Sequence, residues 1–282
     1  MFSFFKRKTS PKAELKKILK GYELPSFPAV VMQILQKIRS PYSSAATIAE
    51  SLALDPGISV KVLGIANSAA LSPAKKVENL TQAVALVGIS QLESLVLGVG
   101  VAQSMPKLTC QWHDPSQFWL TSAKRAVLAS ELARFLCPAK ESECFTAAFL
   151  QDLALPFLAC QRSKDYDAIF EKWHLEGGDL AKLEQETLPW DHTEVASWIC
   201  AEWGLPENIA AAIRGHHGVE VEGHQALGPV RLVAILREKE DNSGMDEFVE
   251  TAVTLYSLEV EKVEAMIEPA FEKAKDLAKI IS

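Results

Sequence analysis

No long hydrophobic segment is present in the 282-residue sequence. The longest nearly uninterrupted apolar stretch runs from Leu95 to Ala102 and includes two glycines. A transmembrane helix needs about 20 apolar residues in succession, so we predict no membrane span. The chain begins MFSFFKRK, with its basic residues after the aromatic ones and no apolar stretch leading to a small-residue cleavage site. We therefore predict no secretion signal.

The cysteines follow no disulfide pattern. They are five in number and include no Cys-x-x-Cys pair: Cys110, Cys137, Cys144, Cys160 and Cys200. A disulfide framework normally has an even number of cysteines at close spacings. We predict reduced thiols and a cytoplasmic protein.

Glycine and proline are also limited, at 14 residues each, while hydrophobic residues make up 48% of the chain. This composition excludes disordered, collagen-like and low-complexity proteins. No Asn-Gly or Asp-Gly pair separates two alternating apolar runs, and the apolar stretches are rich in leucine and alanine. The sequence therefore argues against a protein built of hairpins and sheets.

Helical periodicity is present instead. Apolar residues recur with the i, i+3, i+4, i+7 spacing of one helix face. The two clearest faces are Leu15, Ile18, Leu19 and Tyr22, and Val31, Ile34, Leu35 and Ile38. Small residues recur from Ser122 to Ala133, which lets neighbouring helices approach closely and predicts a central helix there. We predict an all-α protein with a dozen or more short helices.

Capping residues mark the predicted helix boundaries. The predicted starts are Ser10, Asp55 and Asp114, each before a proline, and the capping boxes Ser90 to Glu93 and Asp191 to Glu194. Gly21, Gly204 and Gly215 each close a periodic segment and suit the left-handed conformation of helix ends.

Charge is unevenly distributed along the chain. Residues 1–115 carry 13 basic and 7 acidic side chains, whereas residues 116–282 carry 16 and 29. The acidic second half repels phosphate backbones and argues against a nucleic-acid enzyme with its site there. Seven of the basic residues lie within the first 20 positions. This arm is either a solvated tail or a contact for an anionic membrane or nucleic acid.

Two prolines and a helix cap make the segment from Pro106 to Pro115 the best candidate junction between two helical subdomains. We predict a basic arm at residues 1–20, an N-terminal helical subdomain at 21–112, and a second helical subdomain with C-terminal helices at 113–282.

Two polar residues interrupt a stretch that is otherwise apolar almost all round. Gln151 and Asp152 lie side by side in FTAAFLQDLALPFLAC, and a buried carboxylate needs a partner. Pro156 has no N–H for the carbonyl of residue 152, so we expect the helix to break there. Asp152 is either a metal ligand at that break or a structural carboxylate bonded to backbone or to an arginine.

Three histidines lie in comparable surroundings. His192 follows the cap Asp191 and shares an apolar stripe, so it points inward as a hydrogen-bonded core residue or as a ligand. His216 and His217 lie between two glycines just past a helix, and an irregular turn would let both reach one site. Otherwise they are exposed loop residues. Together with Asp152 these side chains suit a divalent transition metal.

The sequence resembles the HDOD family, a regulatory branch of the HD-domain phosphohydrolase superfamily. The similar segments of the first half are LPSFPAVVMQILQKI, IAESLALDPGISVKVLGIANSA and NLTQAVALVGISQLESLVLG. In the second half, FLQDLALPFL lies where such proteins have their His-Asp helix, and WDHTEVASWICAEWGLPENIAAAI and RGHHG follow. The resemblance covers residues 22–218 and implies a multi-helical HD-domain-like fold with two helical subdomains.

The resemblance also implies where metal ligands lie in active superfamily members. The positions in this chain that match them are Asp152, His192, His216 and His217. In those members the ligands hold one or two metals that activate water against a phosphate ester.

Several expected ligands are missing. Gln151 replaces the histidine of the His-Asp pair, and Thr121 replaces a histidine expected near the start of its helix. The late aspartate would fall at about Leu236 or Arg237, and the lysine that often follows the pair is Leu155. The remaining donors are too few to bind a metal and orient a water, so we predict a vestigial site with at most a weakly bound divalent metal.

Two functions remain open. The favoured hypothesis is a non-catalytic signalling module that binds a protein partner, of the two-component or cyclic-dinucleotide pathways that the resemblance implies, and a small ligand in the degenerate site. The alternative is a metal-dependent phosphohydrolase, a phosphodiesterase or nucleotidase, with a reduced ligand set. No strong nucleic-acid signal is present in the folded part of the chain.

A polar loop in the first half is the candidate partner-binding surface. Asn67 ends a helix, and the chain then passes Leu71 and reaches Lys75 and Lys76 before the cap at Asn79. An apolar residue with a polar rim is typical of a protein interface. Asn67 either satisfies carbonyls at the helix end or belongs to that surface.

Overall fold

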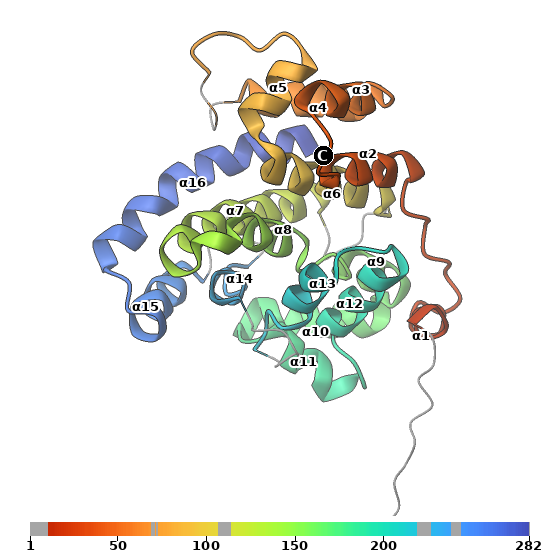
Figure 1. Ribbon diagram of the computed structural model, residues 1–282. Helices are drawn as coiled ribbons and strands as arrows, with labels where there is room; N and C mark the ends of the chain where they lie inside the picture. The colour runs from red at the N-terminus through yellow and green to blue at the C-terminus, as the bar shows by residue number, and fades with distance from the viewer. Residues whose placement is uncertain are drawn as a thin grey trace, which may run out of the picture.

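The computed structural model describes residues 11–68, 71, 73–106, 114–218, 227–237 and 244–281. These residues form sixteen α-helices and one short 3₁₀-helix, with no strand among them (Figure 1). The predicted all-α fold is confirmed. Cys110, the cap Ser10 and most of the predicted junction lie outside the described residues, and the domain boundary at residue 112 stays a prediction.

The first six helices lie before the predicted junction. They are α1 (Pro11–Ile18), α2 (Ala29–Arg39), α3 (Ala45–Leu52), α4 (Pro56–Ala66), α5 (Leu80–Val87) and α6 (Ile89–Ser104). The apolar face predicted from Val31 to Ile38 is buried along its whole length on α2. On α1 and just after it, Leu15, Ile18 and Leu19 are buried as well, and Tyr22 packs against the core. Amphipathic spacing therefore determines which side of these short helices faces inward.

The remaining helices surround a long central helix. They are α7 (Pro115–Leu136), η1 (Pro138–Lys140), α8 (Glu141–Leu150), α9 (Leu155–Gln161), α10 (Ser163–Glu176), α11 (Leu180–Thr187), α12 (His192–Glu202), α13 (Glu207–Arg214), α14 (Gly228–Val233), α15 (Met245–Tyr256) and α16 (Val260–Ile281). Helix α7 packs against α8, α14 and α16 (Figure 1). Its stripe of small residues from Ser122 to Ala133 is largely buried, which confirms the predicted central helix.

The predicted helix break is present at Asp152. Helix α8 ends at Leu150, a turn covers residues 151–154, and α9 begins at Leu155, just before Pro156. The carbonyl of Asp152, which cannot bond to the proline four residues later, accepts the N–H of Leu155 at 2.9 Å instead. The turn places the Asp152 side chain off the helix that precedes it.

Most predicted caps are present. Asp55 accepts the Ile58 N–H at 2.9 Å, Asp114 accepts the Ser116 N–H at 2.8 Å, and Asp191 accepts the Glu194 N–H at 2.9 Å. Gly21 and Gly204 have φ angles of 87° and 66°, as predicted.

One predicted boundary is wrong, and one predicted helix end, Gly215, is in the right place but has a different backbone conformation. Ser90 does not cap a helix, because α6 already begins at Ile89 and Gly88, with φ of 80°, turns the chain sharply from α5. Glu93 instead forms an ion pair with Arg39 at 2.7 Å. Gly215 has φ of −94° and is not left-handed. The left-handed residue lies at Gly218, with φ of 88°, because the chain makes a further turn before it leaves α13.

The helices at the two ends of the chain, α1 and α16, each pack against the opposite half of the sequence. Helix α16 lies along α7 and reaches α4, where Lys61 donates to the carbonyls of Ile280 and, at 2.8 Å, Ile281. Helix α1 packs on α12, and the indole of Trp203 donates to the Pro25 carbonyl at 2.8 Å. The core is therefore continuous across position 112.

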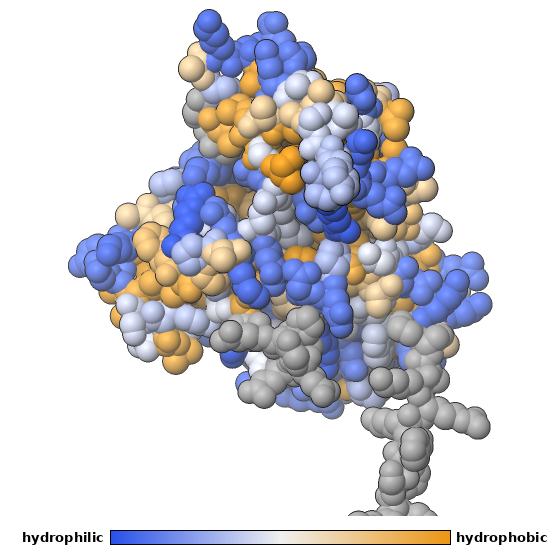
Figure 2. All heavy atoms as spheres, in the orientation of Figure 1, coloured by the Kyte–Doolittle hydropathy of each residue, from blue (hydrophilic) through white to orange (hydrophobic). Residues whose placement is uncertain are grey.

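The consecutive helices η1, α8 and α9, Pro138–Gln161, are together long and apolar enough to cross a membrane, and α5 and α6 pass the same test only as a pair bent by 110°. The long stretch is 83% buried inside the protein. Its apolar character is that of a core helix. Figure 2 shows hydrophobic side chains among hydrophilic ones on the surface over α4 and α15, and the exposed large hydrophobic residues there include Val60 and Leu255.

Candidate functional site

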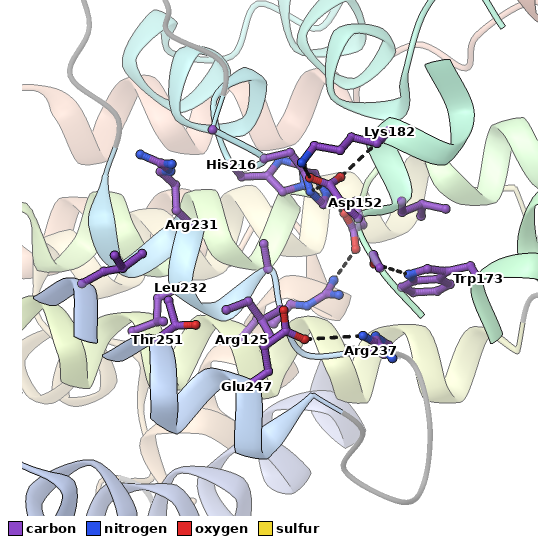
Figure 3. A pocket seen from close by; sticks show the side chains of 18 of the residues that line it. Arg125, Asp152, Trp173, Lys182, His216, Arg231, Leu232, Arg237, Glu247 and Thr251 are labelled. Carbon is purple, nitrogen blue, oxygen red and sulfur yellow. Dashed lines mark hydrogen bonds and ion pairs between the residues drawn. The ribbon is translucent and has the colours of Figure 1, made fainter. Parts of the chain in front are cut away.

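Three elements bring the four predicted site residues together. Asp152 comes from the turn after α8, His192 from the first turn of α12, and His216 and His217 from the turn after α13. Asp152, His216 and His217 line a single pocket with Arg125 of α7 (Figure 3). The prediction that the irregular turn lets both histidines reach one site agrees with this geometry.

Asp152 is bonded to an arginine. Its Oδ2 accepts a hydrogen bond from the guanidinium of Arg125, and the two side chains are only 6% and 3% exposed. The same guanidinium donates through Nε, at 3.1 Å, and through Nη2 to the carbonyl of Leu236. Burial raises the pKa of the Asp152 carboxyl, but the Arg125 guanidinium, followed by His192, outweighs it and holds this pKa well below its usual range.

His192 is fixed by a buried glutamate. Its Nδ1 lies 2.7 Å from Oε2 of Glu184, and its backbone N–H donates to the same oxygen at 2.7 Å. The other carboxylate oxygen of Glu184 accepts the hydroxyl of Tyr166 at 2.5 Å. Burial lowers the pKa of His192, but the Glu184 and Asp152 carboxylates outweigh it and raise this pKa to about 10.

His216 is held in the opposite protonation state. Burial, together with the neighbouring His217, lowers its pKa to about 4. Its Nδ1 donates to the Ile213 carbonyl at 2.6 Å, which leaves Nε2 as an acceptor. The protonated His192 therefore donates from Nε2 to Nε2 of His216, 3.2 Å away. Both of these nitrogens lie 3.4 Å from Oδ1 of Asp152.

His217 lies at the edge of this cluster. Its Nδ1 is 3.0 Å from Oδ1 of Asp179, which precedes α11. Burial raises the pKa of Asp179, but the contact with His217 outweighs it and lowers this pKa to about 2. A carboxylate thus orients His217 as Glu184 orients His192.

The three histidines could hold one metal ion. Their candidate ligand atoms lie within 4.8 Å of one another, and an acceptor fixes Nδ1 of each ring. Such acceptors behind ligating histidines are typical of metal sites. A bound ion would act as a Lewis acid on a phosphoryl oxygen. However, His192 must first lose its proton, and Asp152 is already neutralised by Arg125, so the residues fit a single weakly held ion and not a two-metal centre.

The replaced positions supply no ligands. Thr121 is buried on α7, one turn before Arg125. Gln151 is 1% exposed, and neither polar atom of its side chain has a hydrogen-bond partner among the described residues. At the position of the expected late aspartate, Leu236 presents its backbone carbonyl to Arg125. A neutral amide and a carbonyl turned to an arginine are poor substitutes for the missing ligands.

Sequence reasoning missed three charged residues of the site: Arg125, Asp179 and Glu184. Arg125 lies in a stripe of small residues, and an arginine among them was a signal that its side chain is buried with a partner. Asp179 and Glu184 belong to an acidic helical segment that has the composition of a solvated face.

The candidate partner loop is held by Asn67. Its Nδ2 donates to the carbonyls of Leu63 and Val77, both at 2.9 Å, and its Oδ1 accepts the Val77 N–H at 2.8 Å. Lys75 and Lys76 are exposed. Leu71 is partly buried against the core and lines a small cavity of about 140 Å³. Ala69, Ala70 and Ser72 lie outside the described residues.

Fold and cluster together define an all-helical domain with a histidine and aspartate site beside its central helix. The model of the HDOD domain matches residues 24–219, and the chain belongs to the HDOD family.

Solved structures share this fold. A candidate phosphohydrolase from Shewanella amazonensis SB2B is 20% identical with a TM-score of 0.75, covering 96% of this chain and 99% of that one. A candidate signal transduction protein from Marinobacter aquaeolei VT8 is 16% identical with a TM-score of 0.73, covering 96% and 65%. An HDOD domain protein of unknown function from Geobacter sulfurreducens is 18% identical with a TM-score of 0.69, covering 96% and 98%. At these identities the likeness establishes the fold.

An uncharacterized protein of Treponema pallidum is 21% identical over 212 residues, which are 70% of this chain. The match spans only 38% of that relative's length.

Proposed function

We propose that this protein is a non-catalytic regulatory module of the HDOD type, which binds a signalling protein and a small ligand beside its degenerate site. The observation that carries this proposal is the ion pair between Arg125 and Asp152, closed by the Leu236 carbonyl. The one aspartate that matches a ligand position thus already has a fixed positive partner.

Electrostatics supports the absence of catalysis. Metal-assisted hydrolysis needs a divalent ion that coordinates both a water and the phosphate. Here such an ion would lie close to the guanidinium of Arg125 and would compete with it for Asp152. Gln151 and Thr121 add no ligand that could compensate. The site is better suited to holding a molecule than to breaking a bond in one.

The experiment is a hydrolysis assay on the purified protein. Bis(4-nitrophenyl) phosphate and a mononucleotide are offered with manganese, cobalt, zinc or iron, and Asp152→Ala serves as the comparison. Asp167→Ala, an exposed aspartate on α10, is the matched control. We expect no metal-stimulated turnover in the native protein. Turnover that survives in Asp167→Ala and disappears in Asp152→Ala would refute the proposal.

The second candidate function is a metal-dependent phosphohydrolase with a reduced ligand set. The observation that favours it is the convergence of His192, His216 and His217, each with Nδ1 held by an acceptor. The name of the Shewanella amazonensis relative points the same way, whereas that of the Marinobacter aquaeolei relative favours signalling. Metal analysis separates the two, because an enzyme would hold a full equivalent that survives a chelator.

A cytoplasmic location and a partner from a two-component or cyclic-dinucleotide pathway complete the proposal. The exposed Lys75 and Lys76 beside Leu71 are the surface that we assign to that partner. Pull-down from the native cell with charge-reversed lysines tests the assignment.

A further inference from the structure

We propose that the pocket beside the histidine cluster binds a small organic phosphate, and that Arg231 and Arg237 are its anion-binding residues. The inference rests on the proposed function, because it requires a site that holds a ligand without hydrolysing it. It assigns an anion-binding role to two residues outside the histidine cluster, of which Arg237 lies at about the position of the missing late aspartate.

The pocket has the size of a ligand site. Its volume is about 430 Å³, within the range of about 300–1,000 Å³ typical of small-molecule sites. The histidine turn and Arg125 form one end, the segment between α10 and α11 forms one side, and α14 and α15 form the other (Figure 3). Trp173 and Tyr256 add aromatic surface to the lining. An inorganic phosphate alone would fill only a small part of this space.

Among the described residues that line the pocket, positive charge exceeds negative charge, although residues 116–282 carry 16 basic and 29 acidic side chains. Four cationic side chains line it: Arg125, Lys182, Arg231 and Arg237. The three carboxylates that line it are all engaged: Asp152 by Arg125, Asp179 by His217 and by Lys182 at 3.9 Å, and Glu247 by Arg237 at 3.5 Å. Arg231 forms no ion pair with any side chain that the structure describes. A bound anion would neutralise the positive charge of Arg231.

Both arginine head groups are seated against glycine turns. A Cβ atom at Gly177 would lie 2.7 Å from Nη1 of Arg237, and one at Gly218 would lie 3.0 Å from Nη2 of Arg231. The two glycines have φ of 76° and 88°, so side chains are unfavourable there for backbone reasons as well. Each guanidinium therefore packs directly against the backbone of a glycine turn. A freely solvated surface arginine would not require a glycine at such a position.

A phosphate suits this arrangement better than a cation does. Guanidinium groups bind phosphate oxygens through paired, charge-assisted hydrogen bonds. Figure 3 shows Arg231 and Arg237 on opposite sides of Arg125, so the phosphate would lie in the space between them and the organic part of the ligand against the aromatic surface. Glu247, whose side chain is 60% exposed, competes with the ligand for Arg237.

The test is calorimetric titration of the full chain with adenosine monophosphate, glucose 6-phosphate, inorganic phosphate, adenosine and citrate. Arg231→Gln and Arg237→Gln are the pocket variants, and Glu247→Gln removes the competing carboxylate. Arg39→Gln is the matched control, because Arg39 also pairs with a glutamate but lies outside this pocket.

We expect an organic phosphate to bind at least about tenfold more tightly than adenosine, and each pocket arginine variant to weaken it by about tenfold, as loss of a charge-assisted hydrogen bond predicts. Glu247→Gln should strengthen binding, and Arg39→Gln should leave it unchanged. Thermal melts identify any variant that fails to fold.

Three results would overturn the inference: no binding of either organic phosphate at millimolar concentration, equal binding of citrate, or an affinity insensitive to both pocket arginines. Free phosphate is measured in the same samples. Binding with phosphate release would refute the proposed non-catalytic function and leave the assignment of the pocket standing, so the two failures are distinguishable.

Discussion

Replacing Arg125 with methionine removes the positive partner of Asp152 and leaves most of the hydrophobic stem of the side chain in place. The carboxylate, 6% exposed, and the Leu236 carbonyl then lose their shared donor. Breaking a buried ion pair by removing one partner costs about 3–5 kcal/mol. Because the protonated His192 still lies 3.4 Å from Asp152, we expect a loss near the lower end, about 3 kcal/mol.

The double variant Arg125→Met, Asp152→Asn tests whether the loss of stability comes from the unpaired charge of Asp152 or from altered packing of the core. With no buried charge left over, its free energy of unfolding should recover to within about 1–2 kcal/mol of the native value. Arg134→Met on the same helix is the control, since its side chain is 53% exposed and should cost less than about 1 kcal/mol.

Urea unfolding followed by circular dichroism measures the native protein, these three variants and the single variant Asp152→Asn, and the double-mutant cycle gives the coupling energy. If Arg125→Met costs no more than Arg134→Met, or if the two site substitutions simply add, then Arg125 does not serve as the counter-ion of Asp152. In that case the argument against a metal at this site fails as well.

Further outcomes follow from the same structure. Gln151→His combined with Thr121→His should raise the affinity for cobalt or zinc, read by calorimetry; an unchanged affinity would show that these positions do not face the ligand cluster. Asn67→Ala removes three hydrogen bonds that close its loop and should lower stability by about 1–3 kcal/mol in a thermal melt, whereas a loss below about 0.5 kcal/mol would contradict the anchoring role. Charge reversal of Lys75 and Lys76 should weaken recovery of a signalling partner in a pull-down without lowering the melting temperature, and unchanged recovery would remove this surface from consideration.

Local signals in the sequence predicted the helices well. Asp55 and Asp114 cap helices because a carboxylate before a proline satisfies free N–H groups whatever the rest of the chain does. Pro156 breaks its helix for an equally local reason. Ser90 shows the limit, because the same chemistry was available but the preceding glycine had already turned the chain and started the helix.

The candidate site was predictable only in part. Asp152 and His192 were identifiable as polar residues in apolar surroundings, and of the alternatives left open for Asp152, the structure contains the bond to an arginine. Which arginine it would be was not readable, because Arg125 lies 27 positions away and the pairing depends on how α7 packs against α8. Glu184, eight positions before His192, lies on a helix whose composition looked solvent-facing. Long-range pairings of this kind follow from tertiary packing, which periodicity does not encode.

The guanidinium of Arg125 is covalently attached to the chain, and this distinguishes it from a metal ion in the same neighbourhood. It has no dissociation constant, so a chelator or a cell poor in transition metals leaves the charge beside Asp152 unchanged. The guanidinium is positioned beside Asp152 when α7 packs against α8 during folding, so no separate binding step is needed. The electrostatic environment of Asp152 is therefore set by the fold and does not depend on the metal content of the cell.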